Sequence, residues 1–470
     1  MIPNLRILSD EEIFEIHMAS LQILERTGVR FFLKRALEIL EEGGARVDYS
    51  NQIARIPAGM VEAALSKCSP MVTLYGRDGS PPIQIGGRRV HFGTVGFGTY
   101  TLDWKTGKYR EVLYEDLEEI ARVSETLDQV HFVLPPATPQ DVDKTKTDLY
   151  EFKGCLMNTR KPLIPQALGA SSVGKMVDMA AECVGGHDNL REKPIFSVIF
   201  VITSPLTVRE DIAETIIECA RLTVPIYMGT GPMGGGNSPC SVCGTVALAN
   251  AEILSGIVLA KLVNPMVPVI YATWARNLDL RSGNVAFGAP EFGMIRIATT
   301  QMAQYYRLPS AGGGIICDSK MLDVQMGYEK MATALLPALG GTNMILGMGL
   351  IASENTISLE QLVADDEIAS YVSRVLKGII VDDDRLAVDL IDNMGPGGSF
   401  IQDEHTFRFF KQEYWIPNVT DRTLFNIYTS PEGKSHKARI KKRIEERLGS
   451  YRPLDHYKKI ERALDDIINR

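Results

Sequence analysis

The segments IFSVIFVI (195–202), VPIYM (224–228) and VPVIYAT (267–273) decide the fold of this chain. Each is a short apolar run that ends at small, polar or glycine-rich sequence, and helical patterns over 209–222 and 245–262 separate them. An unbroken apolar run of this length is typical of a strand buried on both faces. Alternation of such strands with helices favours parallel pairing through right-handed crossovers.

The same alternation extends in both directions along the chain. Further apolar runs occupy residues 90–92, 130–134, 162–165, 308–311 and 344–350. Eight strand–helix units over about 270 residues match the size of a TIM (β/α)₈ barrel, which we predict for residues 88–400. A doubly wound open sheet is the alternative.

The sequence patterns at the two ends of the chain differ from that of the predicted barrel. Residues 1–87 predict a small α/β appendage, with a capping box at Ser9–Glu12, a helix over 34–42 and hairpins over 45–57 and 71–86. Residues 401–470 predict a helical extension that packs on the barrel. Its basic part, 434–470, is typical of a solvated helix face.

Composition excludes several classes of protein. The 470 residues are 45% hydrophobic and 23% charged, with a net charge of −8, which is typical of a globular protein and argues against nucleic-acid binding. The run 195–202 is too short to span a bilayer, and the N-terminus lacks a signal-peptide pattern. Seven scattered cysteines suit a reducing compartment, so we expect a cytoplasmic protein without a membrane partner.

Two motifs suggest a cofactor or metal site, and each is incomplete. Cys240–Cys243 is a single pair, whereas zinc needs four ligands. Gly229, Gly231 and Gly234 have dinucleotide-binding spacing, but the loop continues through further glycines instead of opening into a helix. We therefore expect this chain itself to bind neither metal nor cofactor.

Aromatic side chains stand out where the predicted strands end. Phe97, Tyr100 and Trp274 lie there in loops rich in small residues, while charged side chains are scarce at the strand ends. The face of an aromatic ring attracts a cation, and quaternary ammonium groups are the ligands that aromatic cages hold best. The pattern indicates a weakly charged site for such a cation.

Several segments resemble the trimethylamine methyltransferase (MttB) superfamily. They are GAPEFGMI (288–295), GGGIICDSKMLDVQMGYEKMATALLPALGGTNMILGMG (312–349), SLEQLVADDE (358–367), GPGGSF (395–400) and DEHT (403–406). The resemblance implies a TIM barrel that moves a methyl group from an amine to the Co(I) corrinoid of a separate protein. The corrinoid protein would be the partner, and the cofactor would stay on it.

The branch of the superfamily follows from one difference. The trimethylamine enzymes of methanogens carry pyrrolysine in the segment that matches 312–330, where this chain has only standard residues. The chain is thus similar to the non-pyrrolysine branch, which includes glycine betaine methyltransferases. Glycine betaine is the expected substrate, with proline betaine, carnitine or another betaine as alternatives.

A betaine also needs donors for its carboxylate, and Arg276, Gln325 and His405 are the candidates. Arg276 could instead pair with Asp279. Glu291 either complements the ammonium charge or caps its helix. We assign no residue to acid–base catalysis, because a quaternary nitrogen already leaves as a neutral amine.

Two other functions remain open from sequence. One is a barrel lyase or hydrolase that uses Glu291 and Asp318 as acid and base. The other is a non-catalytic protein that binds a betaine. A homo-oligomer is compatible with either, and with the methyltransferase.

Overall fold

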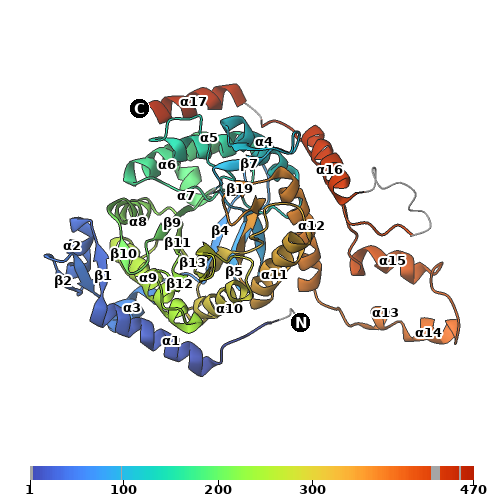
Figure 1. Ribbon diagram of the computed structural model, residues 1–470, viewed down its shortest axis with the longest axis horizontal. Coiled ribbons are helices and arrows are strands. Elements are labelled where there is room, and N and C mark those ends of the chain that lie inside the picture. Colours follow the sequence, from blue (N-terminus) through green and yellow to red (C-terminus); the bar gives the residue numbers. More distant parts are fainter. Residues whose placement is uncertain (1–3, 97, 425–434, 455–456) are drawn as a thin grey trace.

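The computed structural model describes residues 4–96, 98–424, 435–454 and 457–470. At its centre lies a parallel sheet of six strands in the order β6-β17-β16-β13-β11-β9 (Figure 1). The predicted α/β fold with a parallel sheet is therefore confirmed. The strands are β6 (His91–Thr94), β9 (Val198–Ile202), β11 (Ile226–Thr230), β13 (Val269–Thr273), β16 (Ser310–Gly313) and β17 (Met344–Met348).

The order of the strands is that of a ring rather than of a doubly wound sheet. Neighbours follow the chain from β9 to β17, and the first strand, β6, lies beside the last, β17. As regular strands the sheet is not closed. Isolated parallel bridges continue the pairing between the two edge strands, namely Gly93–Phe132, Val133–Leu163, Leu163–Phe196 and Gln166–Ile199.

The segments predicted as strands at 130–134 and 162–165 are thus reduced to single bridges. Proline explains the shortness, because it has no N–H to donate to a ladder. Pro135 and Pro136 follow the first segment, and Pro162 and Pro165 bound the second. The backbone bonds that remain include Ile164 N to Val133 O, at 3.0 Å.

Helices surround the strands (Figure 1). Their apolar faces bury residues such as Leu117, Ile216 and Phe292. They are α4 (Tyr114–Thr126), α5 (Thr147–Asn158), α6 (Ala170–Val184), α7 (His187–Glu192), α8 (Glu210–Leu222), α9 (Val242–Val263), α10 (Pro290–Tyr305), α11 (Val324–Gly340) and α12 (Leu359–Leu376).

Helix α9 is long and apolar enough to cross a membrane by length and composition, which the sequence analysis missed. In the fold, 89% of its most apolar window is buried. It packs against α1, α3, α8 and α10. Its composition is therefore that of a core helix.

The N-terminal region forms the predicted small α/β unit. Ser9 and Glu12 make the capping box of α1, and the hairpins at β2–β3 and β4–β5 are antiparallel as predicted. Strand β1 pairs with β10 (Thr207–Val208), so this unit shares a sheet with the loop after β9. Its elements are α1 (Asp10–Gln22), a π-helix (Ile23–Thr27), β1 (Val29–Phe31), α2 (Lys34–Glu42), β2 (Arg46–Asp48), β3 (Ile53–Arg55), α3 (Ala58–Leu65), β4 (Met71–Leu74) and β5 (Ile83–Gly86).

Short strands also form in the loops beyond the carboxyl ends of the central strands. One small sheet has the order β18-β19-β7-β8 and joins the loops after β17 and β6. Another, β12-β14-β15, joins the loops after β11 and β13. These strands are β7 (Tyr100–Leu102), β8 (Tyr109–Glu111), β12 (Met233–Gly234), β14 (Arg276–Asp279), β15 (Asn284–Val285), β18 (Leu350–Ile351) and β19 (Thr356–Ile357).

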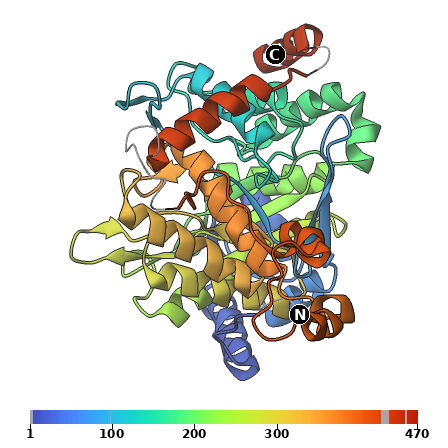
Figure 2. The same cartoon turned by 90° about the vertical axis from the view of Figure 1, so that its right-hand side faces the viewer.

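After α12 the chain leaves the body as residues 377–424, here called the arm. It holds α13 (Asp383–Leu386), α14 (Val388–Met394) and α15 (Glu404–Glu413), which lie at one side of the molecule (Figures 1 and 2). The last helices return to the body: α16 (His436–Ser450) packs on α12 and α4, and α17 (Tyr457–Asn469) on α6 and α5.

Candidate functional site

The carboxyl end of β13 places Trp274 in the fold. The backbone N–H of Trp274 donates to the carbonyl of Thr230, at the end of β11, at 2.6 Å. Only 3% of the Trp274 surface is exposed. Gly313, at the end of β16, makes room for the indole, since a Cβ there would lie 3.3 Å from Trp274 Nε1. The glycine-rich strand ends therefore let an aromatic ring lie across the sheet edge.

Glu354 lies next to this indole, in the turn between β18 and β19. Its Oε1 accepts the Trp274 Nε1–H at 2.8 Å, and its φ of +73° is in the left-handed region. Burial raises the pKa of Glu354 to about 7, although the charge of Arg276 and the bond from Trp274 lower it in part. The sequence analysis missed Glu354 because no motif marks it.

Arg276, two residues after Trp274, carries the opposite charge. Its guanidinium stacks on Phe287, 5.4 Å from the ring centroid, and Nη1 donates to Trp274 O at 3.1 Å. The buried Nε has no hydrogen-bond partner among the described residues. No carboxylate of that part of the chain forms an ion pair with Arg276. Burial lowers the pKa of Arg276, and the charge of Glu354 offsets this lowering in part.

The alternative pairing of Arg276 with Asp279 is wrong. Asp279 accepts instead from the backbone N–H of Arg281 and from the Ser282 hydroxyl, each at 2.9 Å. The guanidinium points elsewhere, because a Cβ on Gly231 would lie 3.1 Å from Arg276 Nη1. The guanidinium of Arg276 is therefore close to Gly231, just after β11, and does not turn back toward Asp279.

Two further buried polar residues lie behind this group, and the sequence analysis missed both. Tyr227, on β11, is fully buried, and its ring centroid is 5.9 Å from that of Trp274. Arg296, on α10, donates to the carbonyls of Thr273 and Ala275. Tyr227 Oη and Arg296 Nε are buried without a partner among the described residues. Buried polar atoms are nearly always paired, so a concentration of such atoms here needs an explanation.

Two buried carboxyls lie on helices next to the central sheet, and burial favours their neutral form. Burial raises the pKa of Glu151, on α5, to about 8, and that of Glu252, on α9, to about 7. Glu252 holds the loop after β9 by accepting from Ser204 Oγ at 2.8 Å and Leu206 N at 2.9 Å. These carboxyls come from the helices, and inspection of the strand ends could not reveal them.

Asp318 is a structural tie. Its carboxylate accepts from the N–H groups of Phe287 and Gly288 and from the Ser353 hydroxyl, at 2.7–3.1 Å. It thereby links the loop after β15 to the turn that carries Glu354. These bonds favour a positioning role over that of the acid or base in a hydrolase.

The structure brings only part of the predicted cage together. The Tyr100 N–H donates to Asn355 O at 3.3 Å, so Tyr100 is close to Glu354 in the fold, but its side chain is 47% exposed. Phe97 lies outside the described residues. Trp274 and Arg276 thus form the centre of the candidate site, with Tyr100 at its edge.

Glu291 and Gln325 lie in the first turns of α10 and α11. Glu291 makes no side-chain cap, since Ala289 is the N-cap and no cap bond forms there, but an acidic residue in a first turn complements the helix dipole. Gln325 is exposed and donates to Glu329 Oε1 at 2.8 Å. Neither residue has a recorded bond to Trp274 or Arg276.

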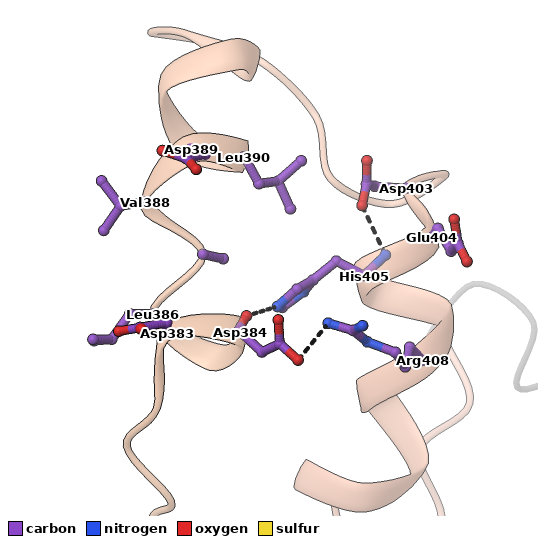
Figure 3. Close-up of a pocket in the computed structure, with 11 residues that line it drawn as sticks. Asp383, Asp384, Leu386, Val388, Asp389, Leu390, Asp403, Glu404, His405 and Arg408 are labelled. Carbon is purple, nitrogen blue, oxygen red and sulfur yellow. Dashed lines mark hydrogen bonds and ion pairs between the residues drawn. The ribbon is translucent and has the colours of Figure 1, made fainter.

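His405 lies in the arm, on α15 (Figure 3). Its Nε2 is 3.0 Å from Asp384 O, and its ring centroid is 4.5 Å from that of Phe409. It lines a cavity of about 690 Å³ between α13, α14 and α15. The structure therefore does not bring His405 together with Arg276.

No group of three or more His, Cys, Asp or Glu side chains within the described part of the chain could hold a metal ion. Cys240 and Cys243 are both exposed, just before and within the start of α9. The groups that the candidate site brings together are aromatic faces, the guanidinium groups of Arg276 and Arg296, and the buried carboxyl of Glu354.

Comparison with known proteins gives a match over the whole chain. The model of the family described as trimethylamine methyltransferase (MTTB) matches residues 1–470. The trimethylamine methyltransferase MttB of Desulfitobacterium hafniense is 34% identical over 98% of this chain and 92% of that protein. The glycine betaine methyltransferase of another strain of that species is 31% identical over 96% and 94%.

Among solved structures, the Methanosarcina barkeri monomethylamine methyltransferase (MtmB) has a similar fold. The TM-score is 0.50 with 13% identity, over 99% of this chain and 95% of that one. At this identity the likeness concerns the fold alone.

Proposed function

The chain belongs to the trimethylamine methyltransferase (MTTB) family, and on that premise we propose that it takes a methyl group from a betaine, glycine betaine first. The acceptor would be the Co(I) corrinoid of a separate protein, which supplies the electron pair of the new bond to carbon. The N–CH₃ bond breaks with its electrons left on nitrogen. Dimethylglycine then leaves with a neutral amine, so no general acid is needed.

One observation carries the choice of a betaine. Arg276 and Glu354 are neighbours of opposite charge that form no ion pair with one another, and the buried Arg276 Nε has no hydrogen-bond partner among the residues that the structure describes. A betaine carries both opposite charges on one small molecule. Its carboxylate would accept from Arg276, while its ammonium would lie toward Glu354.

Trimethylammonium fits this arrangement less well. It has a positive charge to offer Glu354, but nothing that accepts from Arg276. The Arg276 Nε–H would then stay buried without an acceptor among the described residues, which is costly because its hydration is not replaced. The pair of charges therefore favours a zwitterion over a simple methylamine.

The aromatic residues complete the site for the cation. Trp274 and Tyr227 lie 5.9 Å apart, and the Trp274 indole is held in place by its bond to Glu354. A ring face is worth about 0.5–2 kcal/mol to a cation. Since both rings are buried, the ammonium would be desolvated, which strengthens the attraction.

We further propose that the fold works as a complete (β/α)₈ barrel. The isolated bridges at 132–133 and 163–166 supply the two positions that regular strands leave empty. Trp274, Arg276 and Glu354 all follow the carboxyl ends of their strands. Barrel enzymes have their active sites at that end, where the corrinoid protein would also dock.

The reaction can be tested with the purified chain, a reduced corrinoid protein and glycine betaine. We expect dimethylglycine to form in proportion to the corrinoid supplied. Turnover of trimethylamine alone would contradict the betaine assignment. Turnover of betaine without any corrinoid protein would contradict the methyl acceptor.

The Trp274→Ala variant tests the position of the cation. We expect the KM for glycine betaine to rise about tenfold, as the loss of one ring contact requires. The matched control is Trp415→Ala, because Trp415 is an aromatic residue at the base of the arm that donates to Ser370 Oγ. Equal effects of the two substitutions would remove Trp274 from the site.

A further inference from the structure

Cys240 and Cys243 are a pair of cysteines that the proposed function does not use. All seven cysteines of the chain lie within the described residues and are free, and these two are the exposed ones. The other five are buried or half-buried. Accessible thiols react with dissolved oxidants, whereas buried cysteines are inert. The pair is therefore the place where the described chain is most open to thiol chemistry.

The two cysteines lie at the start of the helix of a parallel strand–helix–strand unit. Strand β11 leads into the loop 231–241, α9 follows with Ser241 as its N-cap, and β13 then pairs in parallel with β11. Helix α9 contacts both strands and lies among the helices that surround them (Figure 1). A C-x-x-C motif at this place is typical of dithiol–disulfide redox sites.

The chain before α9 folds back onto the first turns of the helix. The Thr245 hydroxyl donates to Pro239 O at 2.9 Å, and the Thr245 backbone N–H donates to Ser241 O at 3.0 Å. A single helical residue thus holds the carbonyls on both sides of Cys240. The backbone of Cys240 is therefore fixed against the start of α9.

Gly244 allows this close approach. A Cβ at Gly244 would lie 2.9 Å from Pro239 Cβ and 2.7 Å from Ser241 Oγ, so a side chain there would push the preceding segment away. Cys243 is the neighbour of Gly244 in the same helical turn. A disulfide needs Cα atoms about 4.4–6.8 Å apart, which residues three positions apart reach where the chain bends back in this way.

The loop that ends at Cys240 also holds the segment after β13. The backbone N–H of Arg276 donates to Pro232 O at 3.0 Å, and β12 pairs in parallel with β14. Asn237, in the same loop, donates to Ser204 O after β9 at 3.2 Å. Whatever fixes the end of this loop to α9 therefore also restrains the backbone beside Arg276.

We propose that Cys240 and Cys243 form a redox-active dithiol that reacts with small disulfide compounds, such as oxidised glutathione, and closes to an intrachain disulfide. The thiolate of one cysteine attacks a sulfur of the glutathione disulfide, and one glutathione leaves. The other cysteine attacks the mixed disulfide, so that the bond between the two cysteines forms and the second glutathione leaves. The chain loses two electrons and two protons, and both go to the two glutathione molecules.

The bond is a reversible one that restrains the loop. Exposed disulfides have more oxidising potentials than structural ones, so glutathione can also reduce them again. Closure joins residues 240 and 243 covalently, in addition to the hydrogen bonds from Thr245. This chemistry uses no part of the methyl transfer, and it holds whichever amine the chain binds.

The full-length chain in glutathione buffers tests the proposal. The total glutathione is fixed, the share of its disulfide is raised, and free thiols are then alkylated in denaturant. We expect the peptide that contains both cysteines to become lighter by two hydrogens and to escape alkylation, while the other five cysteines take up the reagent. Amide hydrogen exchange over residues 231–239 should become at least about threefold slower in the oxidised chain.

Single variants serve as matched controls. In Cys240→Ser and in Cys243→Ser no second thiol can release the glutathione, so we expect it to stay on the remaining cysteine. That mixed disulfide should be at least about tenfold rarer in the wild type. Cys183→Ser removes a half-buried cysteine and should leave the reaction of the pair unchanged.

Gly244→Ala tests the geometry. The added Cβ pushes residues 239–241 away from the helix, so we expect the oxidised share in one fixed buffer to fall at least about threefold. Circular dichroism checks that each variant is folded. An unchanged oxidised share in a folded Gly244→Ala chain would contradict the close approach on which the pair depends.

Three results for the wild type would overturn the proposal. One is glutathione that stays on Cys240 or Cys243, and another is a chain that stays reduced in fully oxidised glutathione or oxidises Cys68 or Cys183 first. The third is a disulfide that leaves the exchange of residues 231–239 unchanged. None of these readouts depends on turnover. The dithiol can therefore fail while the betaine assignment stands, and the reverse also holds.

Discussion

The region around Trp274, Arg276 and Glu354, here called the mouth, and the arm depart from ordinary folding rules in opposite ways. At the mouth, polar atoms are buried without partners, as at Arg276 Nε, Arg296 Nε and Tyr227 Oη among the described residues. In the arm, apolar side chains such as Ile401 and Phe407 are more than four-fifths exposed. Buried polar atoms without partners are expected where a small polar ligand binds. Exposed apolar side chains are expected where another surface covers them.

The difference also separates two kinds of charge. Around the mouth the carboxyl of Glu354 is buried and its pKa is raised to about 7, so its charge depends on pH and on what lies beside it. In the arm, acidic residues such as Asp383 and Asp389 are exposed or partly exposed. Water screens those charges, so that each contributes little unless a partner excludes the water.

The largest expected effect is at Lys330, which supports the mouth. Its ammonium bonds Asp365 at 2.8 Å and Gly347 O at 3.2 Å, and both members of the ion pair are fully buried. Lys330→Met leaves the Asp365 carboxyl buried and unpaired. We expect the free energy of unfolding to fall by about 3–5 kcal/mol, measured by urea denaturation.

A double variant provides the control. Asp365 also accepts from Gly349 N at 2.7 Å and from Gln361 Nε2 at 2.8 Å, and an amide oxygen could keep one of these bonds. Lys330→Met with Asp365→Asn should therefore lose less stability than Lys330→Met alone. If the two losses simply add, the pair does not act as a unit.

The second effect is on affinity, at Arg276. In Arg276→Gln the betaine carboxylate loses its charge-assisted hydrogen bonds, which are worth about 2–3 kcal/mol. We expect the dissociation constant for glycine betaine, measured by titration calorimetry, to rise about 30- to 150-fold. Choline lacks the carboxylate, and its weaker binding should change by less than about threefold.

An equal loss for choline and betaine would contradict this. Arg276 would then shape the site rather than bind the carboxylate. Arg276→Lys keeps the charge but not the planar fork, and we expect an intermediate dissociation constant. Dissociation constants that increase from wild type to Arg276→Lys to Arg276→Gln would thus indicate a direct hydrogen bond from Arg276 to the betaine carboxylate.

Much of the fold could be read from sequence because it rests on local apolar runs. The runs at 195–202, 224–228 and 267–273 became β9, β11 and β13 with shifts of at most three residues. The runs at 130–134 and 162–165 formed only bridges. Proline has no backbone N–H to donate to a neighbouring strand, so the prolines in these runs shorten the strand pairing. A hydrophobicity pattern does not reveal this missing donor.

The site was harder to read, since its parts come together only through tertiary structure. The sequence placed Trp274 correctly at a strand end, because it follows β13 directly. Glu354 was not found, because it reaches Trp274 across 80 residues by way of the β18–β19 turn. The sequence analysis grouped His405 with Arg276, whereas the structure has it on α15 in the arm. The short motif around His405 carries no information on the position of the arm in the fold.

The third effect is the pH dependence of binding. The Glu354 carboxyl is neutral below a pH of about 7 and ionised above it, and only the ionised form attracts the ammonium. The dissociation constant of glycine betaine should therefore rise as the pH falls through 7, by up to about tenfold between pH 8 and pH 6. Calorimetric titrations across that range would show it.

Glu354→Gln is the control for that profile, because Glu151 and Glu252 also have raised pKa values. The variant should bind weakly at every pH, with a nearly flat profile. A profile that keeps its wild-type slope would assign the titration to one of the two helix carboxyls.

The smallest effect is expected at His405, and it tests whether the two regions are independent. The ring contacts Asp384 O and Phe409 inside the arm, and no bond recorded for the described residues joins it to the mouth. His405→Ala should leave the dissociation constant of glycine betaine within about twofold of wild type, since sites without shared contacts act additively. A tenfold loss would mean that the arm and the mouth act together. The separation between a ligand site and a protein surface would then no longer hold.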